Sequence, residues 1–238
     1  MKRKFAILFV FLLGFNIAPV CSGEQPLFKN PAAGKPESWV YRTSEKHRDW
    51  LVMRDTSKYI KDKDGRSLMV VLSEPEHRRF STTMIMESDN MKTISVTVTG
   101  ETEIVQEARY AGSMASIQYR GFKKREQKKI WVTAVTYDQR TLFWLLRGYP
   151  FQHPREIEID LIMPLGNRCS VKVRYLGTEG ITVPAGKFKA HKLEMEPNAI
   201  LPVFSEKLKT YFWFSTERIP RFLKYAYPAQ GVVAELVK

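Results

Sequence analysis

Cysteine is scarce in this sequence, with only 2 among 238 residues. Cys21 lies at the end of an N-terminal segment that we expect to be removed, and Cys169 then has no partner for an internal disulfide. A lone cysteine at the start of a strand is more often a small buried apolar residue than a nucleophile. The fold must therefore rest on its core, and a chain of this length can bury a full core without cross-links.

Local signatures of catalysis and of metal binding are also missing. The sequence has no glycine-rich phosphate loop, no HExxH, no CxxC and no nucleophile elbow. Its 4 histidines are far apart and lack the spacing of metal ligands. We therefore expect no metal, no cofactor and no enzymatic activity, although a triad assembled from distant residues would leave no local signature.

One uncharged apolar run stands near the N-terminus, FAILFVFLLGF at residues 5–15, after the basic start MKRK. Small residues follow it, ahead of Glu24. This order is typical of a secretory signal peptide, and the run is short of the roughly 20 apolar residues that cross a membrane. We predict cleavage after Ser22 or Gly23. Cleavage at the first point removes residues 1–22, and either one leaves no transmembrane span and delivers the protein to the periplasm.

Cys21 allows a second export route, in which a lipid on this cysteine anchors the mature protein. The usual lipoprotein signal has Leu, then a small residue, then Gly or Ala before the cysteine. Here Ala18, Pro19 and Val20 precede Cys21. We therefore prefer simple cleavage and keep lipidation at Cys21 as the alternative.

Acidic residues are too few to balance the basic ones, with 25 Asp and Glu against 38 Lys and Arg and a net charge of +13. Removing residues 1–22 takes away three positive charges and leaves +10. Such a field attracts anionic partners, and export favours lipid head groups or envelope components over nucleic acid. The alternative is that Lys and Arg only solvate the outer face of a sheet.

Linkers and low-complexity tracts are absent as well, so we expect a single β-rich domain over residues 67–238. Before it, residues 23–66 form a leader of uncertain secondary structure. Residues 24–37 read as extended and on the surface, and residues 38–60 are open between a short helix capped by Ser44 and a strand. Runs rich in Val, Ile, Thr and aromatic residues, separated by short turns, predict strands at 67–73, 79–87, 91–99, 102–110, 114–121, 128–137, 155–164, 170–176, 181–196, 208–215, 220–227 and 232–238. Sequential short strands predict an antiparallel meander that forms a curved sheet, a half-barrel or a barrel.

One buried helix is expected among the strands, at about residues 138–148. Asp138 is a suitable N-cap, leucines recur at helical spacing, and Gly148 followed by Pro150 ends the helix. Because the helix is apolar nearly all round, it must be buried on more than one side. We favour a plug on the concave side or at one end of the curved sheet over a helix packed on one open face.

The segment 156–176 has the pattern of a hairpin in which carboxylates alternate with apolar residues. Glu156, Glu158 and Asp160 form either an acid or cation site or, more simply, a solvated face that meets the bases of the neighbouring strand. A three-residue loop at 166–168 with one residue in the left-handed region would pair Asp160 with Arg174.

The segment ITVPAGKFKAHKLEME, residues 181–196, predicts a second hairpin. Proline presets the second position of a turn and glycine accepts a positive φ after it, so a four-residue loop at 184–187 would place Val183 opposite Phe188. Leu193 and Met195 have the opposite parity to Phe188, which predicts a β-bulge between them.

Three pieces of the sequence resemble a widespread family of exported bacterial β-proteins known as a domain of unknown function. They are TLFWLLRGYPF, VKVRYLGTEGITVPAGKFKAHKLEME with its VPAGxF hairpin, and TYFWFSTERIPRFLKY. The resemblance extends from about residue 67 to the C-terminus, is better after Trp131, and does not include the basic stretch GFKKREQKK. It implies a periplasmic curved sheet or barrel, similar in shape to the LolA and LolB lipoprotein carriers that hold acyl chains. It brings no catalytic residues.

We therefore expect a periplasmic or envelope-associated carrier for an amphiphilic, anionic, lipid-like ligand. The residues expected to contact its apolar part are Leu142, Trp144, Leu145, Leu146, Trp213 and Phe214. The residues expected to contact its head group are Lys123, Lys124, Arg125, Lys128 and Lys129, unless they form only a solvated basic turn. The alternatives are a non-catalytic envelope assembly or structural factor that binds protein or polysaccharide around a filled core, and a hydrolase of unknown type.

Overall fold

The computed structural model describes residues 26–46, 48–76, 80–101, 103–120, 125–198 and 208–238. Within these residues the strands form one 15-stranded sheet in the order β8-β7-β6-β5-β4-β3-β2-β1-β15-β14-β13-β12-β11-β10-β9. Neighbouring strands are antiparallel except for β9 and β10, which are parallel. The prediction of a mainly β protein built as an antiparallel meander is confirmed. The expected signal peptide and Cys21 lie outside the described residues.

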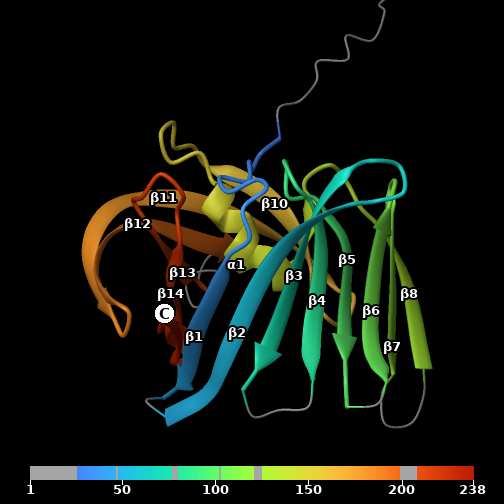
Figure 1. Ribbon diagram of the computed structural model, residues 1–238, viewed down its shortest axis with the longest axis horizontal. Helices are drawn as coiled ribbons and strands as arrows, with labels where there is room; N and C mark the ends of the chain where they lie inside the picture. Colours follow the sequence, from blue (N-terminus) through green and yellow to red (C-terminus); the bar gives the residue numbers. More distant parts are fainter. Residues whose placement is uncertain (1–25, 47, 77–79, 102, 121–124, 199–207) are drawn as a thin grey trace, which may run out of the picture.

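The first eight strands follow one another around the curve of the sheet (Figure 1) and are β1 (Ser38–Glu45), β2 (Arg48–Lys61), β3 (Ser67–Pro75), β4 (Ser81–Glu87), β5 (Thr93–Thr99), β6 (Ile104–Ala111), β7 (Met114–Arg120) and β8 (Arg125–Trp131). The others are β9 (Thr136–Asp138), β10 (Ile157–Ile162), β11 (Arg168–Val183), β12 (Gly186–Pro197), β13 (Thr210–Ser215), β14 (Phe222–Tyr227) and β15 (Val232–Leu236). The helical segments are η1 (Gln139–Thr141), α1 (Leu142–Leu145), η2 (Leu146–Gly148) and η3 (Pro228–Gln230).

In the segment 38–60, which the sequence left open between helix and strand, the described residues form β1 and most of β2. Ser44 is not a helix cap, because it pairs with Asp49 of β2 and with Val233 of β15. Alternate residues of β1, Trp39 and Tyr41, are buried in the main core. β1 therefore joins the N-terminal and C-terminal strands into one sheet.

The predicted helix is present and ends at the predicted residue. Asp138 is its N-cap, with the backbone N–H of Arg140 donating to the Asp138 side chain at 3.0 Å. Only Leu142–Leu145 are α-helical, and a 3₁₀ turn precedes and follows them. The helix lies inside the curve of the sheet (Figure 1), where Trp144 bonds Asp55 of β2 and Phe143 packs near Phe212 of β13. It is a plug, as the sequence analysis favoured.

The predicted strand 128–137 is broken in two, which sends the chain across to the other end of the sheet. Thr133 and Thr136 close a turn, with the Thr136 N–H donating to the Thr133 carbonyl at 3.2 Å. β8 therefore ends before this turn and β9 starts after it. The β propensity of the whole run hid the turn, because Thr and Val are favoured in strands and give no local break signal.

Side-chain bonds hold β9 against the strands from the opposite end of the sheet. The Tyr110 hydroxyl of β6 donates to Asp138 at 2.8 Å, and Lys92 Nζ donates to the Ala134 carbonyl at 2.6 Å. We call these contacts the seam. They bring the two ends of the curved sheet together and make the fold barrel-like.

One half of the barrel interior is filled by the helix and by residues 26–34, and we call it the closed half. The Lys29 N–H donates to the Gly148 carbonyl at 3.1 Å, and a side chain at Gly148 would come within 2.7 Å of the Lys29 carbonyl oxygen. Phe28 is fully buried and meets Tyr137 edge to face. The leader predicted to lie on the surface is thus partly buried, because its apolar residues cover the end of the helix.

The hairpin of β10 and β11 differs in register from the prediction. Asp160 pairs with Ser170 rather than with Arg174. Arg174 instead forms ion pairs with Glu156 at 2.6 Å and with Glu196 at 2.7 Å. Glu156 and Asp160 therefore meet basic residues of the neighbouring strand, Arg174 and Arg168, as the simpler alternative predicted. Asp160 is buried, however, and not part of a solvated face.

The loop of this hairpin is of the predicted kind but lies two residues earlier, at 164–166. Gly166 has a φ of 76°, and the Met163 N–H donates to the Asn167 carbonyl at 2.8 Å. Pro164 can occupy the second position of the turn, so the glycine comes at its end rather than at its start. A shift of two residues keeps the same faces together, which is why the hydrophobic pattern did not reveal it.

The VPAG hairpin also closes more tightly than predicted. Val183 pairs with Gly186 and Ile181 with Phe188, so only Pro184 and Ala185 remain in the loop. The predicted four-residue loop is wrong by two positions, and the parity of the faces is again preserved. A register shift does occur in this hairpin, but in β11, between Tyr175 and Gly177.

Candidate ligand-binding cavity

A cavity of about 850 Å³ occupies the other half of the barrel interior, which we call the open half. Its wall comes from β1 to β4, the start of the helix, β10 to β15 and the turn at residues 228–230. The volume falls in the range of roughly 300–1,000 Å³ that is typical of small-molecule sites. The helix that fills the closed half thus forms one side of this cavity.

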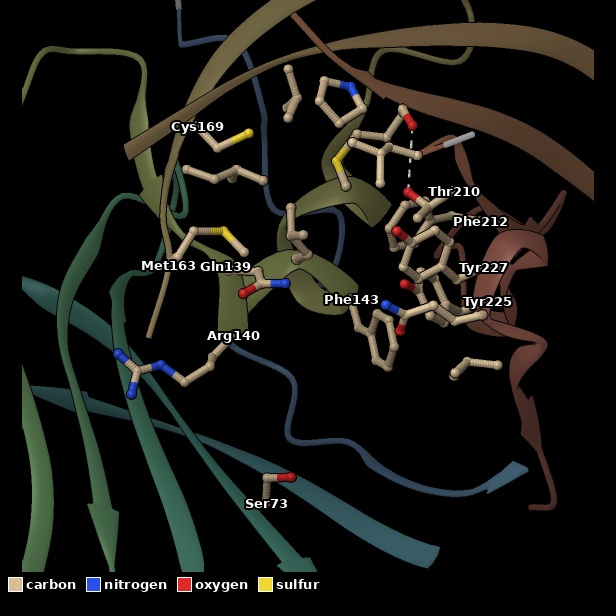
Figure 2. Close-up of a pocket in the computed structure, with 18 of the residues that line it drawn as sticks. Ser73, Gln139, Arg140, Phe143, Met163, Cys169, Thr210, Phe212, Tyr225 and Tyr227 are labelled. Carbon is tan, nitrogen blue, oxygen red and sulfur yellow. Dashed lines mark hydrogen bonds between the residues drawn. The ribbon is translucent and has the colours of Figure 1, made fainter. Parts of the chain in front are cut away.

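The lining is mainly apolar, and its aliphatic part includes Met84, Leu142, Leu161, Val171, Met195 and Val232. An aromatic group completes it (Figure 2), in which Phe143 lies 6.2 Å from Phe212 and 5.6 Å from Tyr225 between ring centroids. Phe143 is held in place because its other side stacks on Phe222 at 4.2 Å. These rings offer a fixed surface to an apolar ligand.

A buried carboxyl group stands where the cavity meets the closed half. Asp55 is 2% exposed and accepts a hydrogen bond from Trp144 Nε1 at 2.9 Å. The Tyr41 hydroxyl is 3.3 Å from the same carboxyl. Burial raises the pKa of Asp55, while the hydrogen bonds from Ser73, Trp144 and Tyr41 act in the opposite direction. The group ties the helix to β2.

Trp144 also stacks on Trp39 in the closed half, with the two ring centroids 3.9 Å apart. Arg147 lies over both rings, at 4.9 Å from Trp39 and 5.4 Å from Trp144. Its side chain is fully buried and forms a bidentate ion pair with Glu37 at 2.6 and 3.0 Å. This charge therefore holds the helix to the leader rather than facing the cavity.

The basic residue that does line the cavity is Arg140 (Figure 2). Its Nε and Nη2 donate to Asp138 at 2.8 and 2.7 Å. Asp138 is fully buried and also accepts the hydroxyl of Tyr110 across the seam. Burial, with the Asp138 charge next in size, raises the pKa of Tyr110 far above its ordinary value, so this hydroxyl stays a donor.

Of the residues predicted to contact the apolar part of the ligand, some line the cavity and others do not. Leu142 lines the cavity. Trp144, Leu145, Leu146 and Phe214 are each 0% exposed and belong to the packed core. They support the cavity but do not form its lining.

Trp213 lies on the other face of the sheet. Its Nε1 donates to Glu179 at 2.6 Å, and Lys192 lies 5.1 Å from its ring. Phe212, the preceding residue, lines the cavity. Adjacent residues of a strand point to opposite faces of the sheet. Because β13 is apolar on both faces, the sequence did not show which of these two residues points into the barrel.

The described lysines of the basic stretch proposed for head-group contact lie away from the cavity. Lys123 and Lys124 are outside the described residues, as is the side chain of Arg125 in β8. Lys128 donates to the Leu165 carbonyl at 2.8 Å, and Lys129 is exposed on the same edge strand. Neither lysine is part of the cavity lining, because β8 is the strand at the end of the sheet.

A second concavity, the basic groove, lies outside the closed half and measures about 1260 Å³. Four exposed basic residues line it, Lys29, Arg155, Lys189 and Arg218. In the part of the chain that the structure describes, none of these four side chains forms an ion pair. Phe151 stacks on His191 at 4.1 Å, and burial, followed by the charge of Lys189, lowers the pKa of that imidazole.

No cluster of three metal-ligating side chains is found among the described residues. Those residues also include no helix that is both long and apolar enough to cross a membrane. Cys169 lines the cavity as a half-buried free thiol, and burial raises its pKa.

Known proteins with a similar fold were found among solved structures. A β-barrel-like protein of the domain of unknown function DUF1849, from Brucella abortus, has a TM-score of 0.50 at 10% identity over 85% of this chain and 96% of that one. A protein thought to be exported, with a YmcC-like fold, from Bacteroides fragilis matches at 11% identity over 89% and 98% of the two chains, but its TM-score of 0.32 is too low to bear on the fold. The first likeness concerns the fold alone.

No curated protein matches the sequence. The model of the family described as "Protein of unknown function (DUF3108)" matches residues 76–237. Since this match spans more than half of the chain, the protein belongs to the DUF3108 family, whose function is unknown.

Proposed function

We propose that this protein is a non-catalytic binding or carrier protein whose cavity holds the apolar part of an amphiphilic, lipid-like ligand. The observation that carries the proposal is the cavity of about 850 Å³ beside the helix, lined mainly by aliphatic and aromatic side chains. A cavity of this lining and size takes an acyl chain or a similar group without a special polar site. Each buried methylene contributes about 0.8 kcal/mol, before the entropy of immobilising the ligand is subtracted.

A catalytic role has less support from the same residues. Asp55 and Arg140, the acidic and basic side chains of the lining, are each held by hydrogen bonds to other protein groups. Cys169 has a raised pKa, which lowers its thiolate fraction and therefore its nucleophilicity. We therefore propose that the protein binds its ligand without converting it.

Export to the periplasm belongs to this proposal. It is supported by the signal-peptide pattern of residues 1–22 and by the resemblance of the VPAGxF hairpin to a family of exported β-proteins, whose shape is similar to that of the LolA and LolB carriers. Deleting residues 5–15 should leave the protein in the cytoplasm in a cell fractionation. Cys21→Ser should leave a soluble periplasmic protein where it is, whereas movement from the membrane to the soluble fraction would show lipidation.

The binding proposal is tested by uptake of a fluorescent fatty acyl probe into the purified mature protein. Val232→Trp should fill part of the cavity and lower the affinity at least about tenfold, since it replaces volume that the ligand needs. Val233→Trp is the matched control, because the side chain of Val233 points to the face of β15 opposite that of Val232. Absence of uptake by the wild-type protein, or equal loss in both variants, would eliminate the carrier function.

The basic groove favours a second candidate function, an envelope assembly factor that docks an anionic polysaccharide. Its test is retention on a heparin column. Lys189→Glu with Arg218→Glu should elute at clearly lower salt than Lys128→Glu with Lys129→Glu, which carries the same change of charge at the far edge strand. Equal shifts would show that only the net charge matters, and this candidate would then be dropped.

A further inference from the structure

The polar groups of the cavity decide which kind of ligand head group can enter it. Within the described residues, Asp55 and Arg140 are the carboxylate and the guanidinium of the lining. A buried ionic head group needs a counter-charge, since burying an unpaired charge costs several kcal/mol. Arg140 could serve as that counter-charge only if its own charge were unpaired.

Arg140 is already neutralised by a carboxylate of its own chain. Its bidentate bonds to Asp138 at 2.8 and 2.7 Å have the geometry of strong charge-assisted pairs. Asp138 has no exposed surface, so it cannot leave the pair for water. The Tyr110 hydroxyl and the helix N-cap bond hold Asp138 further in place. The guanidinium and its carboxylate together present no net charge to the cavity.

One nitrogen of the guanidinium remains without a partner. Nη1 of Arg140 is shielded from solvent and makes no hydrogen bond among the residues that the structure describes. A buried donor without an acceptor is uncommon in native proteins and calls for a group to satisfy it. The Arg140 side chain keeps 15% of its surface exposed and belongs to the lining of the cavity.

We propose that Arg140 selects ligands whose head group inside the cavity is an uncharged hydrogen-bond acceptor, such as an ester or amide carbonyl. This inference rests on the proposed function and makes it more specific. A carbonyl oxygen accepts a hydrogen bond from Nη1 and brings no charge with it. A carboxylate would find a cation already paired with Asp138 and would add a negative charge near Asp55. The anionic ligand expected from the net charge is therefore replaced by a neutral one.

The test compares palmitamide with palmitate as competitors that displace a fluorescent acyl probe at pH 8, where a carboxyl group is ionised. The two ligands share the chain and differ in the charge of the head group. Wild-type protein should bind palmitamide about tenfold more tightly, the effect of one hydrogen bond from a charged donor. Arg140→Met should remove this preference by weakening palmitamide.

Asp138→Asn gives the opposite change and keeps the N-cap oxygen. It leaves the Arg140 charge unpaired, so palmitate should gain affinity and the preference should shrink or invert. Tyr110→Phe is the control for damage at the seam, because it removes a bond to Asp138 and keeps the ion pair. A wild-type protein that binds both ligands equally, or prefers palmitate, overturns this inference even if a variant fails to fold. Failure of the wild-type protein to bind the acyl probe at all overturns the proposed function instead.

Discussion

The closed and open halves of the barrel interior are built on the same strands but are filled in different ways. In the closed half, the helix brings Trp144, Leu145 and Leu146 into contact with the sheet, and all three are fully buried. In the open half, inward-facing residues of the same strands, such as Val171 and Met195, border the cavity. The helical segment runs only from residue 139 to residue 148, so it is short enough to cover one half and leave the other.

The charged groups are paired in both halves but differ in position. Arg147 and Glu37 in the closed half are paired with each other and covered by Trp39 and Trp144. At the border of the open half, Arg140 is paired with Asp138. Each guanidinium keeps one buried nitrogen without a partner among the described residues, Nε in Arg147 and Nη1 in Arg140. Arg140, however, belongs to the lining of the cavity, where a ligand can approach it.

The largest effect is expected from breaking the packing of the closed half. Trp144→Ala removes a fully buried indole, its stacking on Trp39 and its bond to Asp55, and should lower the free energy of unfolding by about 3–5 kcal/mol. Trp131→Ala is the control, because Trp131 is 70% exposed and its loss should change stability by less than about 0.5 kcal/mol. Urea unfolding measures both, and similar losses would contradict the distinction.

The next effect concerns the buried ion pair of the closed half. Glu37→Gln leaves the fully buried Arg147 guanidinium without its anion and should cost about 3 kcal/mol of stability. The double variant Glu37→Gln with Arg147→Met should recover part of this loss, since no unpaired charge remains. Losses that simply add up in a double-mutant cycle would show that the two groups act independently.

A matched pair on one strand compares the two halves directly. Val173 and Val171, two residues apart on the same face of β11, are both buried, but of the two only Val171 lines the cavity. Val173→Phe should overpack the core and cost about 1–3 kcal/mol, while Val171→Phe should cost less than about 1 kcal/mol but lower acyl-probe uptake at least about tenfold. Equal destabilisation by both substitutions would argue that the open half is as tightly packed as the closed half.

The pH dependence at Asp55 tests the border between the halves. Burial raises its pKa in the folded protein, so the folded state binds more protons than the unfolded one above an ordinary Asp pKa of about 4. The contribution of Asp55 to stability is therefore full below about pH 4 and is lost as the pH rises through the raised folded-state pKa. Urea unfolding at a series of pH values should show the wild-type protein losing stability relative to Asp55→Asn as the pH rises from about 4 to 7. A relative gain over that interval would mean that the hydrogen bonds outweigh burial.

The smallest effect is expected at the basic edge strand. Lys128→Glu with Lys129→Glu should change the affinity for an acyl probe less than about twofold at moderate salt, because neither lysine lines the cavity. A large loss of affinity limited to anionic probes would restore the head-group role that the sequence suggested for this stretch.

Local patterns in the sequence were sufficient for several elements. Asp138, Gly148 and Pro150 mark the ends of the helix through capping and chain geometry, which depend on neighbours in the sequence. The alternation of Val, Ile and Thr with polar residues marks most strands for the same reason. The predicted registers of both hairpins are wrong by two residues. The hydrophobic pattern cannot reveal such a shift, because a shift by two preserves the faces of a strand.

The site was less accessible to such reasoning. Trp144 and Phe143 are adjacent apolar residues of the same helix, yet one is sealed between Trp39 and Asp55 and the other borders the cavity. The sequence gives no local signal for a role of Arg140, because it is one of 38 basic residues. Its partner Asp138 meets Tyr110 only across the seam.

The amino-acid sequence was enough for the meander of strands, the capped apolar helix and the basic composition, because each depends on residue types and short spacings. The tertiary structure alone decided that the helix fills one half of the barrel, that the two ends of the sheet meet at Asp138, and that Arg140 enters the cavity already paired. These outcomes depend on how 15 strands curve and which side chains they bring together across long sequence distances. Such contacts leave no trace in the local pattern, because the same alternation is compatible with a filled barrel and with an open one.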